Sequence, residues 1–138
     1  MSIEQKLQQV AATAFDGVPF IFDDIYGLVE RLNTTEMPCV MCTLPRDGRM
    51  TWRNGRVYDR ENIMVGFFDV VEHDADGWDN AEVFNRMKDM ARRYVEALNA
   101  SGLFEHIDTV GYDVYCERYT NITTGLFLQL EISDTGAC

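Results

Sequence analysis

The chain has 138 residues, of which 46% are hydrophobic and 25% are charged, and its formal net charge is −11. This length fits a single domain over 1–138, and the apolar fraction excludes a disordered chain. No run of 18 apolar residues is available to span a membrane, and the first residues lack a signal-peptide pattern, so we expect a protein made in a cytoplasm. An acidic chain is also a poor candidate for binding nucleic acid, because its net charge has the same sign as the phosphates.

The first half of the chain is predicted to contain two helices, a strand between them and a strand after them. Apolar residues at helical spacing predict a helix over residues 2–14 with Ser2 as its N-cap. The short apolar segment 18–22 predicts a strand or an extended link, and a second helix follows over about 24–33. The segment 38–44, Pro-Cys-Val-Met-Cys-Thr-Leu, predicts the next strand, and Pro38 suits the first position of that strand.

The middle of the chain carries the strongest local signal, a β-hairpin. Asn54-Gly55 stands between two short segments of strand-forming residues, 50–53 and 56–58, and Asn-Gly is the preferred pair for a two-residue hairpin turn. Residues 62–71 are almost continuously apolar, which predicts a central strand that is covered at least partly on both faces.

The second half begins with the longest predicted helix, over about 80–100. Asp79 and Glu82 are predicted to form a capping pair at its start, and Gly102 follows its end. Residues 110–119 and 126–132 alternate in polarity and are joined by a short link, so they predict an antiparallel pair of strands. The polar tail 133–138 is expected to fray.

The expected order of elements is therefore α-β-α-β-β-β-α-β-β. Most connections between strands are hairpins, which indicates an α+β fold. We predict a mainly antiparallel sheet with helices packed on one face and a protruding β-hairpin.

The charge is unevenly distributed along this order. Residues 1–36 carry −4 and residues 63–138 carry −9, whereas residues 37–62 carry +2, and all five bases of that middle segment are arginines. Arginine with aromatic residues is the composition of interface hot spots. One interpretation is a solvated hairpin; the other is a basic arm, about 46–60, that docks on the acidic body of a neighbouring copy. The predicted interface residues are Arg46, Arg49, Trp52, Arg53, Arg56, Tyr58 and Arg60.

No motif in the sequence predicts catalysis, a cofactor or a metal. Cys39 and Cys42 form a C-x-x-C, but an odd offset within a strand points the two thiols to opposite faces, so we interpret them as structural. The acidic segment 69–79 lacks the spacing of a calcium loop and is interpreted as a solvated loop, with a weak cation site as the alternative. His73 and His106 have no serine or cysteine partner in the pattern.

The order of elements resembles a family of small tail-completion proteins, the tail terminator or neck proteins of tailed bacteriophages and prophages. The features that carry the resemblance are the N-terminal helix pair, the strand Met37-Pro38-Cys39-Val40-Met41-Cys42, the hairpin 51–58, the strand 63–71, the long helix and the closing strand pair that ends in 124–131. They cover most of the chain and include no catalytic signature.

The resemblance implies a structural virion protein that assembles as a ring, often a hexamer, where the tail tube meets the neck. Its implied partners are further copies of the chain and neighbouring tail-tube or neck proteins, with DNA passing through as cargo and no membrane. An acidic channel would repel phosphate and let DNA slide. Two alternatives stay open: a small-ligand or regulatory binding domain with a concave apolar pocket, and a metal-dependent hydrolase that uses Asp74 and Asp76.

Overall fold

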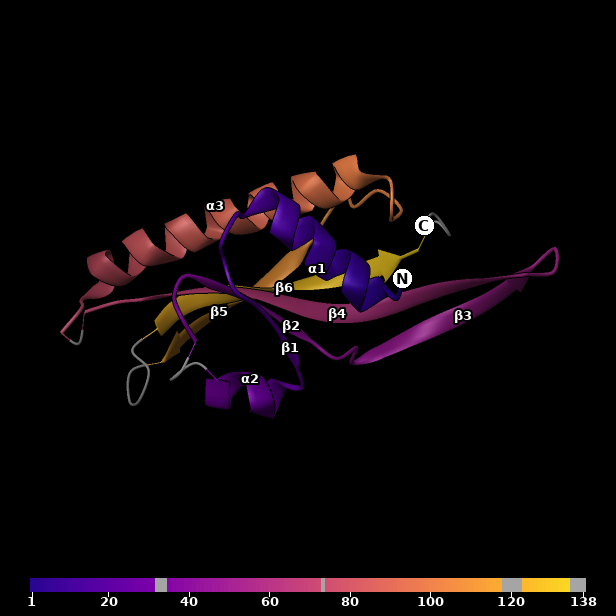
Figure 1. Ribbon diagram of the computed structural model, residues 1–138. Coiled ribbons are helices and arrows are strands. Elements are labelled where there is room, and N and C mark those ends of the chain that lie inside the picture. The colour runs from indigo at the N-terminus through magenta and orange to yellow at the C-terminus, as the bar shows by residue number, and fades with distance from the viewer. Residues whose placement is uncertain (32–34, 73, 118–122, 135–138) are drawn as a thin grey trace.

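We describe a computed structural model of the chain, which covers residues 1–31, 35–72, 74–117 and 123–134. Within these ranges, three helices and six strands follow one another in the expected order, and Figure 1 shows their arrangement. The helices and strands are α1 (Ile3–Ala14), β1 (Phe20–Asp23), α2 (Ile25–Arg31), β2 (Cys39–Thr43), β3 (Asp47–Arg53), β4 (Arg56–Val70), α3 (Gly77–Ser101), β5 (Gly111–Glu117) and β6 (Thr123–Ser133). None of the described helices is both long enough and apolar enough to cross a bilayer.

The strands form one sheet in the order β1-β2-β4-β6-β5, with β3 paired to the outer part of β4. Among the strands of the described residues, β1 and β2 alone run parallel, because α2 carries the chain back between them, and the other pairs are antiparallel. The predicted α+β class with a mainly antiparallel sheet is therefore confirmed.

The main core lies between one face of the sheet and the helices α1 and α3. Side chains such as Leu7 and Tyr94 pack there against Val65 and Leu128, and the Tyr94 hydroxyl donates a 2.9 Å hydrogen bond to the carbonyl of Leu7. The short helix α2 is the exception to the prediction that the helices share one face. It covers the other side of the sheet, where Leu28 packs in a smaller cluster (Figure 1).

The central strand is longer than predicted. The second arm of the hairpin and the apolar segment 62–71 are one continuous strand, β4, whose inner part is buried on both faces, as the sequence indicates. Its outer part leaves the body together with β3, so the hairpin protrudes far beyond the helices (Figure 1).

The start of α3 also differs from the prediction. Asp76, not Asp79, is the N-cap. The Asp76 carboxylate accepts a hydrogen bond from the backbone N–H of Asp79 at 2.9 Å, and the Asp79 carboxylate accepts one from the backbone N–H of Asp76. In the sequence, Asp76 precedes Asp79 by three residues and Asp79 precedes Glu82 by three, so either pair has the spacing of a capping box. The helix begins with the earlier pair. The predicted C-terminal glycine, Gly102, does adopt the left-handed conformation, with φ of 72°.

Candidate assembly interface

The hairpin is held by the turn that the sequence predicts. Asn54 and Gly55 have φ values of 51° and 76°, the left-handed pair that a type I′ turn requires. The strands are paired without a bulge from Arg53 opposite Arg56 to Asp47 opposite Asn62. Because residues directly opposite each other point to the same side, this register assigns every hairpin side chain to one of two faces.

One face of the hairpin is basic. Arg53 lies directly opposite Arg56, and Arg49 directly opposite Arg60, with Tyr58 between the two pairs. We call this surface the arginine face. Like charges placed directly opposite each other destabilise an antiparallel pair. Among the described residues, only Arg60 of these four arginines forms an ion pair. The paired arginines of the hairpin therefore repel each other, and an anionic surface bound to this face would reduce that repulsion.

The other face is apolar. Met50, Trp52 and Val57 point to this side, and they are 60%, 67% and 52% exposed. We call this surface the apolar face. The sequence places Trp52 and Tyr58 together among the arginines, but the register separates them: Tyr58 belongs to the arginine face and Trp52 to its reverse. A strand period of two, applied to residues 49–53, is the signal that distinguishes the faces.

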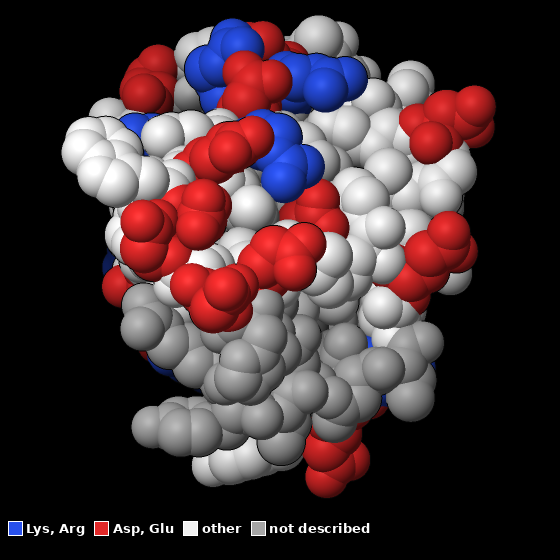
Figure 2. Space-filling model, turned by 90° about the vertical axis from the view of Figure 1, so that its left-hand side faces the viewer, with Lys and Arg blue, Asp and Glu red and all other residues white. Residues whose placement is uncertain are grey.

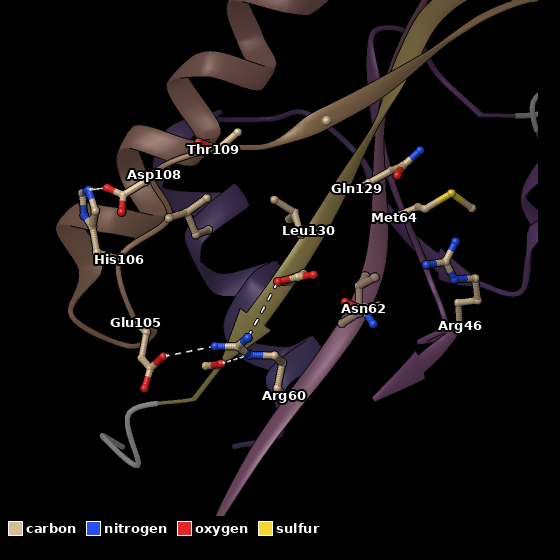
Figure 3. A pocket seen from close by; sticks show the side chains of 15 residues that line it. Arg46, Arg60, Asn62, Met64, Glu105, His106, Asp108, Thr109, Gln129 and Leu130 are labelled. Atoms are coloured by element: carbon tan, nitrogen blue, oxygen red, sulfur yellow. Dashed lines mark hydrogen bonds and ion pairs between the residues drawn. The ribbon is translucent and has the colours of Figure 1, made fainter. Parts of the chain in front are cut away.

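Arg46 and Arg60 lie at the base of the hairpin rather than on its free part. A cavity of about 450 Å³ lies there, between the root of β4, the end of β6 and the loop after α3; Figure 3 shows the residues that line it. The Arg60 guanidinium contacts the carboxylates of Glu105 and Glu131 at 3.8 Å and donates to the Ser133 hydroxyl at 2.9 Å (Figure 3). Because two carboxylates already surround Arg60, this cavity offers an anion little net positive charge.

Glu61 lies at the same root but faces the helix side of the sheet. One of its carboxylate oxygens is buried without a hydrogen-bond partner among the described residues. Burial, together with the neighbouring carboxylates of Glu4 and Asp59, raises the pKa of Glu61 to about 7. The root of the hairpin thus contains a group that titrates near neutral pH.

The end of the molecule opposite the hairpin is acidic. Figure 2 views this end, where α3 begins, and acidic side chains predominate over basic ones on it. Its exposed acids include Glu72, Asp74, Asp76, Asp79 and Glu82. Asp76 and Asp79 cap α3, while the partly buried Asp69 nearby pairs with Arg86 at 3.0 Å. His73 lies outside the described residues, and His106 is exposed beside Asp108 at 3.2 Å.

The cysteine pair sits as predicted, with its thiols on opposite faces of β2. Cys42 belongs to the main core and Cys39 to the cluster under α2, and burial raises the pKa of both thiols to about 12. A thiol with so high a pKa is a weak nucleophile at neutral pH. Within the described part of the chain, no group of three or more His, Cys, Asp or Glu side chains is placed to hold a metal ion.

Comparisons with known proteins add no relative to this description. No protein-family model matches the chain, and no curated protein matches it either. The class of this protein is defined by its fold and its surface. It is an α+β domain with an acidic surface at one end and, at the other, a hairpin that has one basic and one apolar face.

Proposed function

We propose that this protein is a structural virion component of a tailed phage or prophage, made in the cytoplasm of a bacterial host. In this proposal it forms a ring at the tail end or neck, through which DNA passes. The proposal is supported by the order of elements and by one feature above all, a protruding hairpin that carries three arginines without a described acidic partner.

The contact would be made between unlike surfaces. The arginine face lies at one end of the molecule and the exposed acids of Figure 2 lie at the other. A contact between two different patches is heterologous, and it closes into a ring when the rotation between neighbours allows. A hexamer is the size that the family resemblance implies, and neighbouring tail-tube or neck proteins would bind the faces of this ring.

The DNA would be cargo and not a ligand. Each phosphate neutralised by Lys or Arg adds affinity, so a channel lined by acids lets a duplex slide. If the arginines are engaged in contacts between subunits, the assembled ring presents mainly its acidic body to DNA. We expect no retention of double-stranded DNA by the assembled protein at physiological salt.

Charge reversal on the arginine face tests the proposal. Arg53→Glu with Arg56→Glu should abolish the oligomer in light scattering while the circular dichroism of the fold stays unchanged. Arg53→Gln with Arg56→Gln should weaken it. The control is Gln8→Glu with Gln9→Glu on the exposed side of α1, which changes the net charge by the same two units as the neutral pair. Unchanged assembly of the reversal variant contradicts the role of the arm.

The same measurements separate the alternative classes. A wild-type protein that remains monomeric, with no rings in negative-stain electron microscopy, favours the small-ligand domain. A measurable hydrolytic activity that is lost when Asp74 and Asp76 are replaced by Ala favours the metal-dependent hydrolase, provided that the helix capped by Asp76 remains folded.

A further inference from the structure

A second concave surface lies between α3 and the edge strand β5. It has a volume of about 490 Å³ and is open to solvent. Its apolar lining consists of Ala91, Val95, Val110, Tyr112, Leu126 and Leu128. We call it the α3–β5 groove. The ammonium group of Lys88 lies at its side, 5.5 Å from the centre of the Tyr112 ring and 5.9 Å from that of Phe84.

The apolar face of the hairpin is the matching convex surface. Three large side chains, Met50, Trp52 and Val57, leave more than half of their area in solvent on a two-stranded arm. The arm cannot fold back into the groove of its own chain, because β4 continues from the arm straight into the middle of the sheet. Exposed Trp beside Met is a composition enriched at the centre of protein interfaces.

One charged residue lies beside each apolar surface. Asp59 is opposite Met50 in the hairpin and therefore shares its face, and Lys88 borders the groove. Neither side chain forms an ion pair with any described residue, whereas Arg92 at the same groove is engaged by Asp89 and Glu96. Opposite charges, one beside each apolar surface, favour a pairing in one orientation.

We propose that the apolar face of the hairpin docks in the α3–β5 groove of a second copy, with Asp59 placed against Lys88. The inference rests on the proposed self-assembly and states which surfaces meet in it. A small apolar molecule in the groove would leave Trp52 in water, whereas a second copy covers both surfaces at once. The arginine face, on the reverse of the arm, stays available for the acidic surface of a neighbour.

Deletion of the indole is the first test. Trp52→Ala should weaken self-association on the order of thirty-fold in sedimentation analysis, because truncating a central hot-spot residue costs about 2 kcal/mol. Tyr26→Ala is the control: Tyr26 is an aromatic residue on α2 that is 80% exposed and lies outside the apolar face, the groove and the named acids, so its removal should leave association unchanged. Exchanging the charges supplies a second test, since Asp59→Lys and Lys88→Asp should each weaken association and together restore it.

A mixing experiment identifies the two surfaces directly. Val110→Lys should block the groove but keep the hairpin, and Trp52→Ala should do the reverse. At a protein concentration where the weakened association leaves each variant monomeric, a mixture of the two should form a one-to-one dimer. Val114→Lys is the control, because Val114 is an exposed residue of β5, four positions after Val110 in the chain, and lies outside the groove. Far-ultraviolet circular dichroism confirms that each variant is folded.

The outcomes separate this contact from the proposed function. A wild-type chain that never associates overturns both. If the wild type associates and Arg53→Glu with Arg56→Glu abolishes it, but Trp52→Ala and Val110→Lys assemble normally, the groove is not the docking site and the assembly proposal stands. A heterodimer that appears only in the mixture supports the contact proposed here.

Discussion

The ammonium group of Lys6 lies 2.9 and 3.0 Å from the two carboxylate oxygens of Asp134, across a separation of 128 residues. Lys6 is only 2% exposed, although it belongs to a polar stretch of α1. The ion pair ties the first helix to the end of the last strand. It also overturns part of one prediction: Ser133 completes β6 and Asp134 is held, so these two residues of the predicted frayed tail are ordered. Residues 135–138 lie outside the described part.

Loss of this ion pair should be costly. Lys6→Ala leaves a partly buried carboxylate without its ammonium partner, which should lower the free energy of unfolding by about 2–3 kcal/mol. Gln8→Ala removes an exposed polar side chain from the same helix and should change it by less than about 0.5 kcal/mol. Urea denaturation followed by circular dichroism measures both. Equal effects of the two substitutions would contradict a structural role for the buried pair.

Gly125 should tolerate no side chain. A Cβ atom at this position of β6 would lie 1.9 Å from the Phe67 carbonyl oxygen and 2.7 Å from the Phe68 ring, in a fully buried part of the sheet. Gly125→Ala is therefore expected to cost about 3 kcal/mol or more. Gly111→Ala is the control, since a Cβ on Gly111 meets nothing within 4 Å on the adjacent strand. A thermal midpoint of Gly125→Ala equal to that of Gly111→Ala would show that the strands shift freely.

The features that the sequence predicts well are those fixed by neighbouring residues. Asn54-Gly55 determines its turn alone, and Ser2 caps α1 through Gln5, three residues away. The fixed position of Asp134, by contrast, depends on its ion pair with Lys6 at the other end of the chain. No local pattern contains that information.

The sequence predicts which residue types the candidate interface contains, but not which of them share one face of the hairpin. Five arginines in 15 residues are visible in the sequence, whereas their separation from Trp52 requires the strand register. The groove that we pair with Trp52 combines residues from α3, β5 and β6, and only the tertiary fold brings these together. The position of α2 is unpredictable for the same reason, because an apolar stripe suits either face of a sheet.

The cysteines should differ sharply in reactivity. In a Cys138→Ser background, a disulfide reagent at neutral pH should modify one thiol of the native protein, Cys116, which is exposed. Cys39 and Cys42 should react only after denaturation, because burial excludes the reagent and raises the pKa of both thiols to about 12. Replacing Cys116 by Ser should remove the rapid reaction, and fast modification of a second thiol would contradict the buried positions of the pair.

Glu61 should make stability depend on pH. Its pKa rises from the ordinary 4.5 to about 7 through burial and the carboxylates of Glu4 and Asp59, so between these values the folded chain binds more protons than the unfolded one. Stability should therefore fall as the pH rises from 4.5 to 7, and the loss should be complete above 7.

Glu61→Gln removes the buried charge and tests this dependence. The variant should be more stable than the wild type above pH 7, on the order of 1 kcal/mol for a partly solvated carboxylate, and the difference should vanish near pH 4.5. Denaturation midpoints measured from pH 4.5 to 8 provide the comparison. Glu82→Gln, at an exposed position of α3, changes the net charge equally and should show no such window. A difference between Glu61→Gln and the wild type that stays constant over this range would mean that Glu61 is solvated as an ordinary surface carboxylate.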